Sequence, residues 1–77
     1  MGYYKTGEYV KARFECERTP GIGESMWLKV DYSDDAERIV YGKLDNDPVV
    51  VTDLRPGMDL AIAYERVIEH RKKIKTM

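Results

Sequence analysis

The 77-residue sequence contains a single cysteine, tryptophan, phenylalanine and histidine, and it has no long apolar run. One cysteine, Cys16, excludes an internal disulfide and any metal site built from several cysteines. No segment approaches the roughly 18 apolar residues of a membrane span, and no charged and then apolar leader opens the chain. These absences predict a cytoplasmic protein without membrane contact.

The length of the chain allows one domain, which buries roughly 60% of the surface that its unfolded form exposes. Apolar residues make up 43% of the sequence and charged residues 35%, with both signs mixed. This composition is that of a folded domain rather than a disordered chain. The formal net charge of −1 excludes a uniformly basic coat for nucleic acid.

Charge is unevenly distributed along the chain. Residues 1–64 carry 8 basic and 12 acidic residues, a net charge of −4, whereas residues 65–77 carry 5 basic and 2 acidic residues, a net charge of +3. We expect residues 71–77 to form a solvated basic tail, although such a block can also reach a polyanion. The basic residues of this tail are Arg71, Lys72, Lys73 and Lys75.

Alternation of apolar and polar residues predicts a series of short strands after a lead-in over residues 1–7. Turns rich in Gly, Pro, Asn and Asp separate them. The expected strands are 8–16, 26–32, 38–44, 49–52 and 58–64. The apolar side of the second strand consists of Met26, Leu28, Val30 and Tyr32.

The C-terminal part allows two interpretations. We favour one short helical turn around 64–67 followed by a brief strand near 68–70, and the alternative is a continuous helix over 61–73. Gly42, inside the third strand, predicts a bulge or a bend. Four or five strands at this spacing predict an all-β fold, a small five-stranded SH3-like barrel over residues 8–70 with one short helical turn near its C-terminus.

The residue types needed for catalysis do not form a recognisable group. Cys16 falls on the apolar side of its strand, where we expect a small buried hydrophobe rather than a reactive thiol. His70, which has no nucleophile or ligand partner at a known spacing, is expected at the surface. We predict no enzyme activity and no cofactor.

Acidic and aromatic residues are the candidate binding groups. A metal ion is not expected, because Asp residues in these turns bond their own backbone and the glycine of a calcium loop is missing. The acidic surface candidates are Asp31, Asp34, Asp35, Asp45 and Asp47. The aromatic candidates are Trp27, Tyr41 and Tyr64. Trp27 shares the polar side of its strand with Lys29, so it either packs under a neighbouring segment or lies at a binding surface.

A family resemblance rests on three segments: Met26-Trp27-Leu28-x-Val30, Gly42-x-Leu44-x-Asn46-Asp47-Pro48 and Leu54-x-x-Gly57. Together they resemble the YegJ-like domain of unknown function, a family of small bacterial and phage-encoded proteins. The segment 59–64, with Glu69-His70 after it, is similar to the end of its phage-type members. The resemblance covers about residues 8–70 and implies a compact β-rich domain with no assigned catalytic residues.

Three hypotheses for the function remain open. The favoured one is a non-enzymatic protein-interaction module, with a protein partner or a second copy of itself. The second is a phage- or mobile-element-encoded inhibitor of a host or defence protein, whose acidic side chains mimic nucleic acid. The third is a nucleic-acid-binding small barrel, against which the net charge of −4 over residues 1–64 argues.

Overall fold

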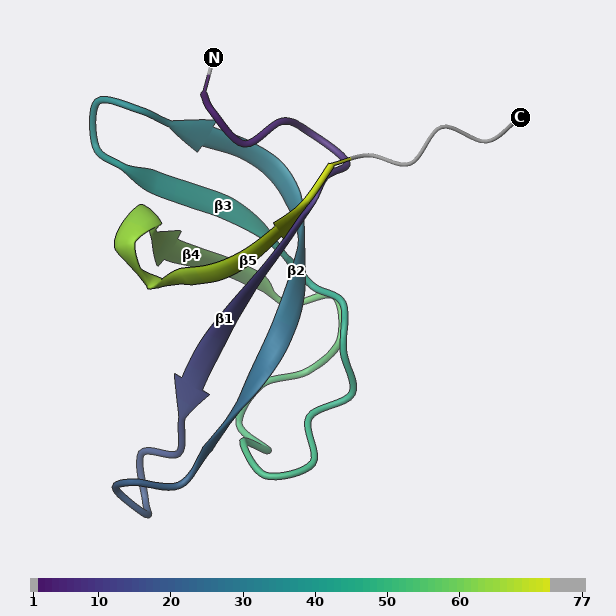
Figure 1. The fold of residues 1–77 in the computed structure, drawn as a ribbon. Coiled ribbons are helices and arrows are strands. Elements are labelled where there is room, and N and C mark those ends of the chain that lie inside the picture. The colour runs from purple at the N-terminus through teal and green to yellow at the C-terminus, as the bar shows by residue number, and fades with distance from the viewer. Residues whose placement is uncertain (1, 73–77) are drawn as a thin grey trace.

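The computed structural model describes residues 2–72, which form one antiparallel sheet (Figure 1). Its elements are β1 (Tyr9–Glu15), β2 (Gly23–Asp34), β3 (Ile39–Leu44), β4 (Asp59–Ala63), the 3-10 turn η1 (Tyr64–Arg66) and β5 (Val67–Arg71). The strand order is β4-β3-β2-β1-β5, with β4 and β5 at the two edges. The all-β prediction is confirmed, and so is the favoured helical turn followed by a strand. Within the described range no helix is long and apolar enough to cross a bilayer.

The sheet curls because β2 is long and irregular. Its first half pairs with β1 and its second half pairs with β3. The pairing with β3 shifts register between Val30 and Tyr32, which leaves Asp31 as a bulge. Gly42 lies opposite Val30, where a side chain would collide with the carbonyl group of Lys29. The irregularity expected at Gly42 is therefore present, with the extra residue on β2.

The bulge turns Tyr32 away from the core. One extra residue reverses the alternation of side chains beyond it, so Ser33 is buried and Tyr32 is 56% exposed. The prediction that Tyr32 belongs to the apolar side of its strand was wrong, because alternation along one strand does not register a bulge.

Residues 49–52, predicted as a strand, form a bend and a turn. The backbone N–H groups of Val49, Val50 and Val51 all donate to Oε1 of Glu24, at 2.9, 2.7 and 2.9 Å. A carboxylate thus takes the place of a neighbouring strand as the acceptor for these donors. Only Val51 reaches the core, and Val49 is 79% exposed.

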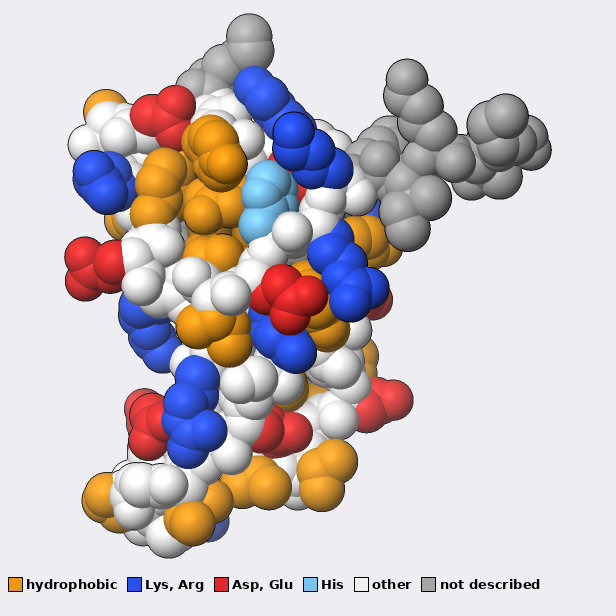
Figure 2. Space-filling view, viewed as in Figure 1, with side chains coloured by type: hydrophobic (Ala, Val, Ile, Leu, Met, Phe, Trp, Pro, Cys, Tyr) orange, Lys and Arg blue, Asp and Glu red, His pale blue; other side chains and the backbone are white. Residues whose placement is uncertain are grey.

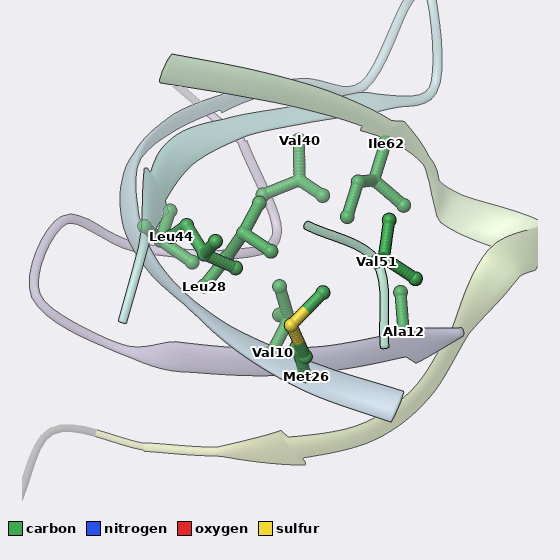
Figure 3. Close-up of a cluster of buried hydrophobic side chains, with 9 residues drawn as sticks. Val10, Ala12, Met26, Leu28, Val40, Leu44, Val51 and Ile62 are labelled. Atoms are coloured by element: carbon green, nitrogen blue, oxygen red, sulfur yellow. The ribbon is translucent and has the colours of Figure 1, made fainter. Parts of the chain in front are cut away.

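The core lies inside the curled sheet and draws on β1, β2, β3, β4 and the loop between β3 and β4 (Figure 3). It consists of Val10, Ala12, Met26, Leu28, Val30, Val40, Leu44, Val51 and Ile62. Cys16 does not join it: the residue follows β1, is half-buried, and donates its N–H to the carbonyl of Ile22 at 2.7 Å. The expectation that Cys16 is a core residue was wrong, since β1 ends one residue earlier.

The segment before β1 packs against the second half of β2. The N–H of Gly7 donates to the carbonyl of Val30 at 2.8 Å. The N–H of Tyr4 donates to Oγ of Ser33 at 3.0 Å, and the Ser33 hydroxyl donates to the Tyr4 carbonyl at 2.8 Å. These bonds satisfy the buried hydroxyl of Ser33 and fix the segment on the sheet.

Candidate binding surface

The three aromatic candidates have different surroundings. Trp27 lies on the outer side of β2, facing β1. Tyr41, on β3, stacks on Tyr32 with the ring centroids 4.6 Å apart. Tyr64, at the start of η1, packs edge-on against Tyr4 with the centroids 5.0 Å apart. The structure therefore does not bring the three together into one aromatic patch.

Trp27 belongs to a surface that we call the basic face, formed by the outward side chains of β1, β5 and the first half of β2. Alternation along each strand points these side chains away from the core. The four basic side chains of this face outnumber its two carboxylates, and Figure 2 shows blue and red side chains interspersed where β1 and β5 cross the front of the molecule. The basic face consists of Tyr9, Lys11, Arg13, Glu15, Trp27, Lys29, Glu69 and Arg71, and Glu15 forms an ion pair with Arg13.

Strand pairing sets the neighbours of Trp27 on this face. Lys11 of β1 lies between two neighbours: it is directly opposite Trp27 of β2 on one side and directly opposite Glu69 of β5 on the other. The Lys11 Nζ atom is 5.3 Å from the centroid of the indole ring, and the guanidinium carbon of Arg71 is 5.0 Å from it. Each such cation–π contact contributes about 0.5–1 kcal/mol at an exposed site. The indole therefore holds two cations in place.

The turn after β3 positions the backbone of Trp27. The N–H of Trp27 donates to Oδ1 of Asn46, and its carbonyl accepts the N–H of Asp45 at 2.9 Å. A groove of about 240 Å³ opens beside the indole, lined by Tyr9, Trp27, Asp45, Arg71 and Lys72. Its walls are aromatic and its charged groups are two cations and one carboxylate. The arrangement suits a partner that brings an anionic group next to an apolar one.

Of the five candidate aspartates, two pairs lie at opposite ends of β3. Asp34 and Asp35 border the turn before this strand, whereas Asp45 and Asp47 follow the strand. Asp31, at the bulge, forms an ion pair with Lys43 at 3.1 Å. The structure therefore does not unite these residues in one acidic surface.

Asp34 and Asp35 also serve the fold. Oδ1 of Asp34 accepts the N–H of Ala36 at 2.9 Å, which stabilises the turn. Oδ1 of Asp35 accepts the hydroxyl of Tyr64 at 2.6 Å and the N–H of Tyr3 at 2.9 Å. These hydrogen bonds hold the pKa of Asp35 below its usual range.

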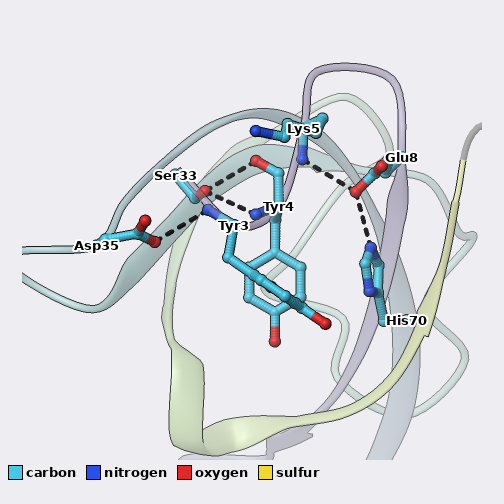
Figure 4. A network of polar contacts seen from close by, with 7 residues as sticks. All are labelled: Tyr3, Tyr4, Lys5, Glu8, Ser33, Asp35 and His70. Atoms are coloured by element: carbon cyan, nitrogen blue, oxygen red, sulfur yellow. Dashed lines mark hydrogen bonds and ion pairs between the residues drawn. The ribbon is translucent and has the colours of Figure 1, made fainter. Parts of the chain in front are cut away.

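A second group of rings, the aromatic cluster, consists of Tyr3, Tyr4, Tyr64 and His70, of which Figure 4 shows Tyr3, Tyr4 and His70. His70 is half-buried here, with its ring 4.8 Å from that of Tyr4, and its Nε2 lies 2.7 Å from Oε1 of Glu8. The expectation of a surface histidine was wrong, because β5 pairs with β1 and places His70 opposite Val10, beside the N-terminal segment.

Glu8 is a buried carboxylate that connects both ends of the domain. Burial raises the pKa of Glu8, but hydrogen bonds from the N–H of Lys5, at 2.9 Å, and from His70 outweigh it, so the pKa lies below its usual range. The Glu8–His70 pair connects the start of β1 to β5, so its role is to hold these two segments of the fold together. Within residues 2–72 no group of three His, Cys, Asp or Glu side chains is placed to hold a metal ion.

The structure describes the predicted basic tail only as far as Lys72. Arg71 is the last residue of β5 and Lys72 follows it, while Lys73 and Lys75 lie outside the described residues. Sequence reasoning did not select Tyr9 and Lys11 as site residues. The signal was present, since the alternation that buries Val10 places both of them on the outer side of β1. Alternation within β1 could not predict that β5 pairs with β1 and brings Arg71 beside these residues.

No family model matches the chain, and no curated protein and no solved structure matches it. The resemblance to the YegJ-like family stays a prediction.

Proposed function

We propose that the protein is a non-enzymatic interaction module whose basic face binds a protein partner around Trp27. The observation that carries this proposal is the indole ring beside a groove, with the cations of Lys11 and Arg71 over it. Trp and Arg side chains contribute most to binding at protein interfaces. The buried core consists of nine other apolar residues. Trp27 is therefore a large aromatic residue outside the core, where a partner can reach it.

Spatial segregation of charge supports the same surface. The formal net charge of the chain is −1, yet the basic face carries four basic side chains against two carboxylates, Glu15 and Glu69. Segregated charge steers partners of opposite sign and orients them on approach. Net charge along the chain therefore understates how basic this one surface is.

We further propose that the sheet is an SH3-like barrel and that the chain belongs to the YegJ-like family. The strand order and the 3-10 turn between β4 and β5 support the first part. Two residues of the resembling segments support membership of the family, because each has a structural role. Asn46 accepts a hydrogen bond from the backbone of Trp27, and Gly57 adopts a φ of 84° in its turn, which favours glycine. Neither the fold nor the family sets the function.

Affinity capture with matched variants tests the proposed function. The tagged protein, Trp27→Ala and Tyr32→Ala are used as baits, because Tyr32 is an exposed aromatic residue of the same strand outside the basic face. We expect a partner that the unmodified chain and Tyr32→Ala capture and that Trp27→Ala loses. Thermal unfolding verifies that each bait is folded.

A second bait, Lys29→Glu, covers the case in which Trp27→Ala does not fold. Lys29 is exposed and forms no ion pair within residues 2–72, so we expect the charge reversal to leave the fold intact while it changes the basic face. We expect Lys29→Glu to reduce capture as well. If folded Trp27→Ala, or Lys29→Glu, captured the partner as well as the unmodified chain does, the basic face would not be the binding surface.

A further inference from the structure

We infer that the groove beside Trp27 binds an acidic polypeptide segment, with a carboxylate of the partner against the guanidinium of Arg71. This inference rests on the proposed function and names the chemistry of the partner at the same surface. It starts from Arg71, the one residue that both lines the groove and has its guanidinium over the indole.

The indole orients Arg71 without using its hydrogen-bond donors. The indole has a single N–H donor and no acceptor atom, so its cation–π contact with Arg71 does not satisfy the guanidinium N–H groups. The one ion pair of Arg71 within residues 2–72 is a long contact, 3.6 Å from Nε to Oε2 of Glu69. A carboxylate can therefore take two parallel hydrogen bonds from a guanidinium that is already held in place.

Other cations add to the attraction for an anion. Lys72 lines the same groove, in which Asp45 is the one carboxylate. Lys29 lies in the row that contains Tyr9 and Arg71, and it has no ion pair among the described residues. The groove and its surroundings therefore have an excess of positive charge that an acidic segment would neutralise.

The size of the groove indicates a side chain rather than a free small molecule. Pockets for drug-sized ligands hold about 300–1,000 Å³, and this groove holds about 240 Å³. One side chain fits that volume, with its chain continuing across the open surface. Tyr9 and Trp27 offer apolar contact for a neighbouring side chain of the same segment.

A single-stranded nucleic acid fits the same surface less well. Such strands bind by stacking successive bases on free aromatic faces. The indole of Trp27 already has the cations of Lys11 and Arg71 over it. The observations therefore favour an acidic polypeptide.

Fluorescence of Trp27 reports directly on the groove, because it is the only tryptophan of the chain. The full chain is titrated with the capped peptide Gly-Glu-Glu-Leu-Glu-Glu-Gly, with the same peptide carrying Gln for every Glu, and with a single-stranded oligothymidylate. We expect a saturable change in emission with the acidic peptide that weakens as salt is raised. The Gln peptide is expected to bind about tenfold more weakly or worse, because hydrogen bonds to a charged group are lost.

Two variants with the same change of charge locate the effect. Arg71→Gln is expected to weaken binding of the acidic peptide about tenfold or more. Arg18→Gln, in the turn between β1 and β2, is expected to bind it as the unmodified chain does. Arg71 is exposed at the end of β5, so both variants are expected to fold, which circular dichroism verifies.

Four results would overturn the inference: no saturable response to the acidic peptide, equal affinity for the Gln peptide, equal affinity of Arg71→Gln and Arg18→Gln, or tighter binding of the oligothymidylate. Any of these, together with capture of a partner that depends on Trp27, leaves the proposed function standing and removes only the acidic ligand. Capture that does not depend on Trp27 removes the proposed function instead.

Discussion

The basic face and the aromatic cluster both contain large rings, but the rings have different neighbours. In the aromatic cluster, Tyr4 packs against Tyr64 and His70. The Tyr64 hydroxyl and the His70 ring are hydrogen-bonded to the carboxylates of Asp35 and Glu8. On the basic face, the neighbours of Trp27 are the cations Lys11 and Arg71 beside an open groove. The comparison shows that the number of aromatic residues does not separate those that hold the fold from those available to a partner.

Packing against the core explains the difference in role, because Tyr4 and Tyr64 pack against the buried core residues and Trp27 does not. The Tyr64–Asp35 hydrogen bond joins residues 29 positions apart, and the His70–Glu8 contact joins residues 62 positions apart. The contact of Trp27 with Arg71 also joins distant residues, so separation along the chain does not distinguish the two regions. The contacts of Trp27 with Lys11 and Arg71 lie on the outside of paired strands that the core already supports. Stability should therefore depend more on the aromatic cluster than on the basic face.

The largest expected effect comes from Tyr4→Ala. This half-buried ring packs against the core, Tyr64 and His70, so we expect unfolding free energy to fall by about 2–3 kcal/mol and Tm by about 10 °C or more. Urea and thermal unfolding measure both quantities. A change within about 0.5 kcal/mol, the usual range for a surface substitution, would show that the aromatic cluster does not hold the fold.

Acid is expected to weaken the same end of the domain through Glu8. Its pKa in the folded protein lies below the ordinary value of 4.5, so the unfolded chain takes up the proton first as pH falls. The stability that ionised Glu8 contributes is present above pH 4.5 and is lost as pH falls through the lower folded pKa.

Comparison with Glu8→Gln isolates this contribution from other carboxylates. Between about pH 5 and pH 3 the unfolding free energy of the unmodified chain should fall more steeply than that of the variant. Urea unfolding at a series of pH values gives both curves. Parallel curves would mean that the contacts of Glu8 with Lys5 and His70 do not favour its ionised form.

A smaller loss of stability is expected for Trp27→Ala. The indole is half-buried and outside the core, so we expect about 1 kcal/mol, which is less than for Tyr4→Ala. Unfolding in urea under the same conditions measures the two variants side by side. A loss equal to or greater than that of Tyr4→Ala would reverse the comparison and assign Trp27 chiefly to the fold.

The smallest effect is local and concerns the loop between β3 and β4. Three N–H groups on its carboxylate hold the pKa of Glu24 below the ordinary value of 4.5. The amide proton shifts of Val49, Val50 and Val51 should therefore move together at a pH below 4.5 in NMR spectra, with little change in β1. In Glu24→Ala this shared transition should vanish, and its persistence would show that another group causes it.

Local chemistry explains what sequence reasoning could reach. Alternation placed β1, β3 and β4 within a few residues, and the Asn-Asp-Pro and Pro-Gly turns correctly separated β3 from β4. A helical turn around 64–67 before the last strand was also predicted, and the structure has it at Tyr64–Arg66. The same alternation put Tyr9, Lys11 and Trp27 on outer surfaces, although it did not identify Tyr9 and Lys11 as neighbours of the candidate site.

Sequence alone determined that this chain is a single all-β domain and which side of most strands is apolar, because side chains alternate within each strand. Tertiary structure decided the rest. The bulge at Asp31 turned Tyr32 outward, Glu24 held residues 49–51 as a loop, and β5 brought Arg71 onto the indole of Trp27. Each of these depends on residues that are far apart in the chain, and the period of a single strand contains no information about its neighbours.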